Sequence, residues 1–131
     1  MISRSAAIET RILVVSNNIF RRELLCFQLD EAGYRVYEAC DAAEAQEIIS
    51  TVPIHILILD TRLPHSEAVL AAARRSASNP ALIVITDAIP TRRMPLPTHD
   101  CSTLTWPYEH ATLLRMVQHR VPIAETMHER Y

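Results

Sequence analysis

Short apolar runs alternate with segments of helical periodicity along most of this 131-residue sequence. The most apolar run, residues 54–59, predicts a central strand that is buried on both faces of a sheet. Similar runs predict four more strands, and 3.6-residue periods predict the helices between them. The predicted strands are residues 11–15, 35–39, 54–59, 81–86 and 102–105, and the predicted helices are residues 19–32, 41–50, 66–76 and 109–121.

Strands that alternate with helices pair in parallel through right-handed crossovers, and the helices cover both faces of the sheet. The sequence therefore predicts an α/β fold, a flavodoxin-like doubly wound five-stranded parallel sheet in the order 2-1-3-4-5. The region of the fourth helix, residues 87–101, is predicted to be irregular because three prolines remove backbone donors that a helix needs. The length fits a single domain, 1–131, with a core at about 11–121, a polar N-terminal segment 1–10 and a C-terminal tail 122–131.

Two features of the composition exclude whole classes of site. Gly33 is the single glycine, which excludes a P-loop and a dinucleotide-binding fingerprint, because both need several glycines near phosphate. All 13 basic residues are arginine, so no mechanism can use a lysine amine. Three cysteines, Cys26, Cys40 and Cys101, are expected to be reduced, because their number and spacing fit neither a disulfide framework nor a zinc site.

Charge and hydropathy predict a cytoplasmic protein. A net formal charge of −2 gives no reason to expect nucleic acid or an anionic membrane as a partner. No apolar run approaches the roughly 20 residues that a membrane span needs. The first residues of the chain are polar and lack the apolar core of a secretory signal.

Polar residues follow four of the predicted strands. In an open parallel sheet, ligands bind at the carboxyl ends of the strands, so these residues are candidates for a site. They are Ser16-Asn17, Asp60-Thr61, Thr86-Asp87 and Thr105-Trp106.

Several short motifs are spread over about residues 11–121. In chain order they are Arg22-Glu23-Leu24-Leu25, Glu31-Ala32-Gly33-Tyr34, Glu38-Ala39, the stretch 57–64 around Asp60, Thr86, and Leu104-Thr105-Trp106-Pro107-Tyr108. Together they resemble the motifs of the receiver domains of two-component response regulators. The resemblance implies that Asp60 is the phosphoacceptor equivalent and that Thr86 is its switch partner. It also implies that Pro107 follows a cis peptide bond.

Departures from the family pattern decide the predicted function. Ser16 and Asn17 stand where the family has two acidic residues that hold Mg²⁺ together with the phosphoacceptor. Trp106 replaces the lysine that contacts the phosphoryl group. Magnesium prefers carboxylate and water oxygens, so we expect no metal site and no cofactor. Mg²⁺ is expected only if the domain still accepts a phosphoryl group.

Three other residues could compensate for these losses. Asp87 could restore one carboxylate, although a helix cap or a solvated charge is the simpler interpretation. Arg62 or Arg92 could take the place of the lysine. Since the neighbouring acids are gone, Asp60→Asn should relieve little repulsion, and it is expected to change stability by no more than about 1 kcal/mol.

We therefore interpret the chain as a pseudo-receiver, a phosphorylation-independent protein-interaction module in two-component or phosphorelay signalling, and not as an enzyme. Its expected partners are proteins, such as a histidine kinase or an output protein, and a homodimer could form through the last strand and helix. The first alternative is a phosphoaccepting receiver that uses Asp60 in an atypical site. The second is a small flavodoxin-like enzyme or nucleotide-binding protein.

Overall fold

A computed structural model describes residues 9–87 and 101–121. Its strands are β1 (Arg11–Val15), β2 (Arg35–Ala39), β3 (Ile56–Asp60), β4 (Ala81–Asp87) and β5 (Cys101–Trp106). Its helices are α2 (Ile19–Glu31), α3 (Ala42–Thr51), α4 (Ser66–Arg75) and α5 (His110–Gln118). The predictions for the proline-rich region, the first eight residues and the C-terminal tail fall on 88–100, 1–8 and 122–131, which lie outside the described residues.

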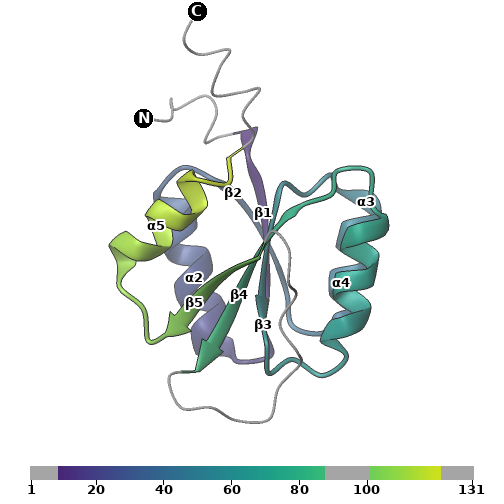
Figure 1. Cartoon of the computed structure of the whole chain (residues 1–131), viewed down its shortest axis with the longest axis horizontal. Helices are drawn as coiled ribbons and strands as arrows, with labels where there is room; N and C mark the ends of the chain where they lie inside the picture. Colours follow the sequence, from purple (N-terminus) through teal and green to yellow (C-terminus); the bar gives the residue numbers. More distant parts are fainter. Residues whose placement is uncertain (1–8, 88–100, 122–131) are drawn as a thin grey trace, which may run out of the picture.

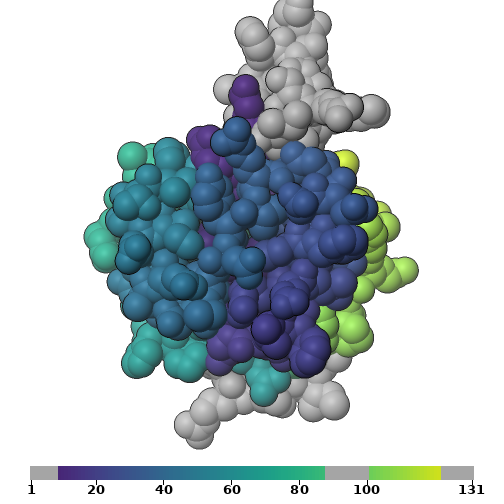
Figure 2. Space-filling model, turned by 180° about the vertical axis from the view of Figure 1, so that it is seen from behind, coloured from purple at the N-terminus to yellow at the C-terminus, as the bar shows by residue number. Residues whose placement is uncertain are grey.

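The five strands form one parallel sheet in the order β2-β1-β3-β4-β5, as the sequence predicted. Helices α2 and α5 cover one face of this sheet, and α3 and α4 cover the other (Figure 1). Seen from behind, the dark blue surface of α2 lies beside the yellow-green surface of α5 (Figure 2). Every residue of β3 is buried, which confirms it as the central strand.

Two apolar layers hold the helices to the sheet, because successive side chains of a strand point to opposite faces. Ile12 and Val14 of β1 contribute to the layer under α2 and α5, together with Leu25, Leu29, Leu113 and Val117 of the helices. Leu13 and Val15 contribute to the layer under α3 and α4, together with Ala45, Ile49, Val69 and Ala73. The carboxyl ends of β1, β3 and β4 are thus anchored by buried side chains on both sides.

A side-chain cap sets where α2 begins. The Asn18 Oδ1 atom accepts hydrogen bonds from the backbone N–H groups of Phe20 and Arg21, at 3.0 and 3.1 Å. Gly33, with a φ of 99°, follows the end of α2 in the left-handed region that favours glycine. Arg21 is therefore held in the first turn of α2, next to the carboxyl end of β1.

Within the described residues, no helix is both long enough and apolar enough to span a bilayer.

Candidate functional site

The carboxyl edge of the sheet brings the predicted site residues close together. Asp60 is the last residue of β3 and pairs in register with Ile85, which immediately precedes Thr86 on β4. Ser16 follows β1 and is fully buried. Thr86 is also buried, but the hydrogen bonds to the Asp60 carboxylate come from other groups.

Both carboxylate oxygens of Asp60 are engaged, and the residue is only 1% exposed. Its Oδ2 atom accepts a hydrogen bond from the Ser16 hydroxyl at 2.9 Å. Its Oδ1 atom accepts one from the backbone N–H of Arg62 at 3.0 Å. Ser16 therefore serves here as a hydrogen-bond donor to Asp60, at a position where the family resemblance implies a second carboxylate.

A buried arginine supplies the positive charge of the site. The Arg21 Nη1 atom lies 3.6 Å from Asp60 Oδ2, and Nη2 forms a hydrogen-bonded ion pair with Asp87 Oδ1. The Arg21 side chain is only 8% exposed. Its guanidinium also lies over the Trp106 ring, 4.8 Å from the ring centroid, at a distance typical of a cation–π contact.

The surroundings of Arg21 explain why it can be buried. Two carboxylates and an aromatic face surround the guanidinium, so the loss of its hydration is offset on several sides. Its Nη1 atom is the one buried side-chain nitrogen or oxygen without a hydrogen bond in the described part of the chain, because 3.6 Å is too long for one. Arg21 thus interacts with Asp60 mainly through charge.

The sequence-based interpretation missed Arg21. Within α2, Arg21 precedes the buried Leu25 and Leu29 by four and eight residues, so all three lie on the inward face of the helix. An arginine in this series must be buried, and a buried guanidinium needs a carboxylate partner. That spacing was the available signal for Arg21, whereas the residues predicted to replace the lysine were Arg62 and Arg92.

The residues that the sequence offered as replacements for the lost lysine and acids do not lie where Arg21 does. The Arg62 side chain is 54% exposed, and its Nη1 atom lies 3.6 Å from Asp87 Oδ2. Arg92 lies outside the described residues. Asp87 is not a free carboxylate, since it is paired with Arg21 and approached by Arg62.

The donor set does not fit Mg²⁺. Asn17, Asn18, Arg21, Asp60 and Arg62 line a small hollow of about 240 Å³ at the carboxyl edge. A divalent cation about 4 Å from the Arg21 guanidinium would be repelled by about 8 kcal/mol at an effective dielectric constant of 20. Across residues 9–87 and 101–121, no group of three or more His, Cys, Asp or Glu side chains is placed to hold a metal.

Trp106, at the end of β5, and Tyr108, just after it, form an aromatic pair beside Arg21. The Trp106–Pro107 peptide bond is cis. The Trp106 and Tyr108 rings meet edge to face, with centroids 5.3 Å apart. Tyr108 donates a hydrogen bond from its hydroxyl to Gln28 Oε1 at 2.6 Å, and burial raises the pKa of Tyr108 to about 12. Tyr108 therefore stays a hydrogen-bond donor at neutral pH and ties the segment after β5 to α2.

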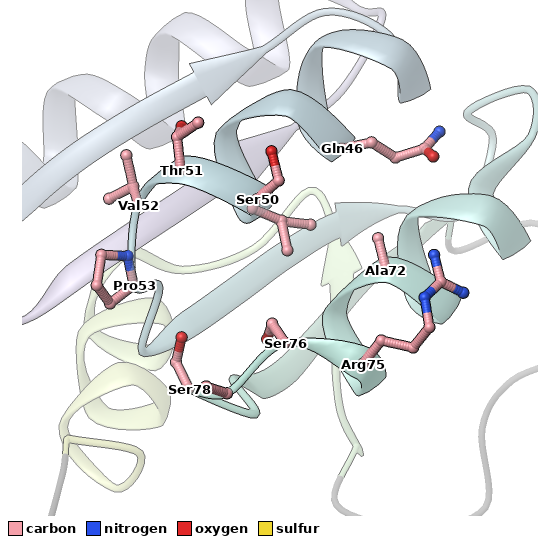
Figure 3. A pocket seen from close by; sticks show the side chains of 11 residues that line it. Gln46, Ser50, Thr51, Val52, Pro53, Ala72, Arg75, Ser76 and Ser78 are labelled. Carbon is pink, nitrogen blue, oxygen red and sulfur yellow. The ribbon is translucent and has the colours of Figure 1, made fainter.

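A larger hollow of about 710 Å³ lies between the carboxyl-terminal ends of α3 and α4 (Figure 3). The hydroxyls of Ser50, Thr51 and Ser76 in its wall donate to backbone carbonyls of their own helices. Because these groups are already satisfied locally, they do not converge on a bound molecule. The hollow is therefore a weaker candidate than the carboxyl edge.

We expect the cysteines to differ in reactivity at pH 8. All three are free; Cys40 is exposed, whereas Cys26 is partly buried. Burial, followed by the nearby Glu38, raises the pKa of the Cys26 thiol to about 12, so it stays protonated. Iodoacetamide should modify Cys40 first in the native protein and reach Cys26 only after unfolding, as peptide mass mapping will show. Equal labelling of Cys26 and Cys40 in the native state would contradict this.

No protein-family model matches the chain. In sequence, the chain is 36% identical over 76 residues to the aerobic respiration control protein ArcA of Escherichia coli. The match covers 57% of this chain and 32% of ArcA, so the chain spans about a third of that relative.

In structure, the chain is similar to several receiver domains. A response regulator receiver domain protein from Bacillus halodurans has a TM-score of 0.72 and 17% identity, covering 86% of this chain and 97% of that one. The chemotaxis protein CheY4 of Vibrio cholerae has a TM-score of 0.70 and 22% identity, covering 85% and 98%. The receiver domain of a sensor histidine kinase from Pseudomonas aeruginosa, solved with magnesium coordinated in its active-site cleft, has a TM-score of 0.71 and 20% identity, covering 86% and 97%.

Proposed function

This chain has the fold of response-regulator receiver domains, and from that premise we propose that it is a phosphorylation-independent protein-interaction module in two-component or phosphorelay signalling. A domain of this fold is a signalling domain and not a classical enzyme. The proposed partners are proteins of the same pathway, such as a histidine kinase or an output protein, and the proposed location is the cytoplasm. A homodimer through β5 and α5 is a further proposal of the sequence analysis.

The position of Arg21 is the observation that carries this proposal. A receiver that accepts a phosphoryl group needs a free carboxylate as nucleophile and a metal ion to neutralise the incoming charge. Here Asp60 Oδ2 accepts a hydrogen bond from Ser16 and faces the Arg21 guanidinium, while Oδ1 accepts one from the backbone. The nucleophile is held by the protein itself, and the cation next to it repels a metal ion.

The charges of the site support the same conclusion. The resemblance implies a site in which three carboxylates are offset by Mg²⁺ and a lysine. In this chain, the carboxylates of Asp60 and Asp87 are offset by the guanidinium groups of Arg21 and Arg62. Two carboxylates and two guanidinium groups make the site formally neutral without a metal. Trp106, at the lysine position, provides the ring on which Arg21 lies.

The test is phosphoryl transfer from a small donor. We expect that incubation with acetyl phosphate and Mg²⁺ adds no phosphoryl mass to the intact wild-type protein, because Asp60 is held by Ser16 and Arg21. Asp60→Asn should bind the same partner and give the same cellular output as the wild type. A phosphoaccepting receiver treated in parallel serves as the positive control. A phosphoryl mass on the wild type that disappears in Asp60→Asn, with loss of output, would overturn the proposal.

One observation favours the first alternative, a phosphoaccepting receiver. Asp60 lies at the carboxyl end of the central strand and lines the small hollow at that edge. A structural neighbour holds magnesium in its active-site cleft. If Arg21 moved away, Asp60 would face that hollow, and the acetyl phosphate experiment would detect the resulting chemistry.

A further inference from the structure

The hollow between the carboxyl-terminal ends of α3 and α4 has apolar walls. Ile49 and Val52 line it on the side of α3, and Ala72 and Ala77 line it on the side of α4 (Figure 3). Its volume of about 710 Å³ is in the range of sites that enclose a ligand or a few side chains. The hydroxyls in its wall are bonded to their own helices, so the apolar walls and the charges at the rim determine what it can bind.

Arginines stand on both sides of this hollow. Arg75, the last residue of α4, lines it and is exposed, as is the preceding Arg74. Across the hollow, Pro53 also lines it, and the Nε atom of Arg11 donates a hydrogen bond to the Pro53 carbonyl oxygen at 2.7 Å. In Figure 3, Pro53 and the Arg75 guanidinium lie on opposite sides of the hollow. An occupant that carries carboxylates could therefore contact a cation at each end.

Neighbouring side chains do not neutralise these cations. None of the ion pairs found within residues 9–87 and 101–121 involves Arg11, Arg74 or Arg75. None of the described residues that line the hollow is acidic: Glu47 of α3 is not among them, and Glu67 lies in the first turn of α4, at the far end of that helix. The dipoles of α3 and α4 place about half a negative charge each at this end, which offsets about one of the three positive charges. The rim therefore remains positive.

The shape and charge of the hollow argue against two other anionic occupants. Nucleic acid binds extended basic surfaces and offers no apolar side chain to the walls, and the whole chain has a formal net charge of −2. An anionic membrane takes up apolar side chains that protrude from a protein, whereas those of Ile49 and Ala72 line a concave surface. A peptide segment supplies both carboxylates and an apolar side chain that can enter the hollow.

We propose that the hollow between α3 and α4 binds an extended acidic segment of a partner protein, with an apolar side chain in the hollow and Asp or Glu side chains at Arg11 and at Arg74-Arg75. An apolar anchor in a pocket supplies most of the affinity of such a contact, and opposite charges at the rim set partner choice and association rate. The inference rests on the proposed function in one respect, namely that the domain acts by binding proteins. It does not depend on the chemistry of Asp60, because Pro53 lies before β3 and Asp60 lies at its carboxyl end.

The test uses two short labelled peptides that share a central leucine–phenylalanine pair, flanked by glutamates in one peptide and by lysines in the other. We expect the glutamate peptide to bind the full chain at least roughly tenfold more tightly than the lysine peptide in fluorescence anisotropy. Replacing the central pair of the glutamate peptide with serines should weaken binding at least roughly tenfold, because the anchor is lost. Ala77→Asp adds a carboxylate to an exposed part of the wall and should weaken binding of the glutamate peptide by a similar factor.

A matched pair of variants separates the hollow from general basicity. Arg75→Gln removes one charge from the rim and should weaken binding of the glutamate peptide at least roughly threefold. Arg115→Gln removes the same charge from the last turn of α5, on the other face of the sheet, and should leave binding unchanged. Thermal melts of both variants should match the wild type, because both side chains are exposed. Equal binding of the two peptides, no binding of either, or equal weakening by the two variants would overturn the inference.

Competition and sedimentation cover the other occupants. Duplex DNA or phosphatidylserine vesicles that displace the glutamate peptide from the wild type but do not bind Arg75→Gln would assign the hollow to those anions and overturn the inference. A dimer of the wild type that Ala77→Asp dissociates would assign it to a second copy, with the same consequence. The phosphoryl-transfer experiment does not involve this hollow. Failure of the peptide experiment with no phosphorylation would reject only the α3–α4 hollow, whereas phosphorylation of Asp60 with peptide binding would reject only the phosphorylation-independent mechanism.

Discussion

Replacing Arg21 with methionine is expected to lower the free energy of unfolding by about 3–5 kcal/mol at pH 7, the range found when one partner of a buried ion pair is removed. Asp60 is 1% exposed and would keep its hydrogen bonds from Ser16 and the backbone but lose its cation. Among the cations of the described residues, Asp87 would keep the more distant and exposed Arg62. Urea unfolding followed by circular dichroism measures the loss.

Arg22→Met is the matched control for this prediction. Arg22 is the next residue of the same helix, and its ion pair with Glu38 is partly exposed, because the Glu38 side chain is 55% accessible. We expect a smaller loss for Arg22→Met, about 1 kcal/mol, as measured for ion pairs near solvent. The double variant Arg21→Met and Asp60→Asn should lose less than the sum of the two single changes, because the cation and its carboxylate leave together. A loss below about 1 kcal/mol for Arg21→Met would contradict the role given to Arg21.

The same geometry adds a cation to the stability argument for Asp60. The small effect expected for Asp60→Asn took into account only the acids missing at Ser16 and Asn17. In the structure, Arg21 approaches Asp60 and also pairs with Asp87. The small stability effect expected for Asp60→Asn therefore no longer follows. The unfolding free energies of Arg21→Met, Asp60→Asn and the double variant measure how strongly Arg21 and Asp60 interact.

A second large effect is expected when a metal site is built into the chain. The variant combines Ser16→Asp, Asn17→Asp and Arg21→Ala, and we expect it to bind Mg²⁺ at least roughly a hundredfold more tightly than the wild type. It gains two oxygen ligands of the kind that Mg²⁺ prefers, and it loses a cation that repels the ion by about 8 kcal/mol at 4 Å and a dielectric constant of 20. Calorimetric titration, with a rise in melting temperature on adding Mg²⁺, provides the measurement.

The informative control retains Arg21. Ser16→Asp with Asn17→Asp alone should bind Mg²⁺ much more weakly than the variant that also lacks the guanidinium. Trp106 is the single tryptophan of the chain and lies against Arg21, so its fluorescence reports on the site in each protein. Clear submillimolar binding of Mg²⁺ by the wild type would mean that Arg21 leaves the site and that another carboxylate binds the ion. Asp87 would be the first candidate for that ligand.

Local patterns in the sequence determined the fold. The buried strand β3 and its parallel neighbours were predictable because a strand buried on both faces must be apolar over its whole length, and the sheet order followed from the strand–helix alternation. The inward Leu25 and Leu29 of α2 follow the helical period in the same way. The apolar run of a buried strand and the period of a helix are both patterns among residues that are close together in the sequence. The positions of Ser16, Asp60 and Thr86 at the carboxyl edge follow from the same topology.

Only the tertiary structure decided which charges meet at that edge. Arg21 is paired with Asp87, which is 66 residues away in the sequence, and it also lies beside Asp60 and on Trp106. No local period links these residues, because each comes from a different element and they meet only when the strands take their places in the sheet. An arginine side chain is long enough to reach any of several carboxylates, so its partner is not determined by sequence position. Burial makes the pairing energetically important, because a charge removed from water is costly unless a counter-charge lies nearby.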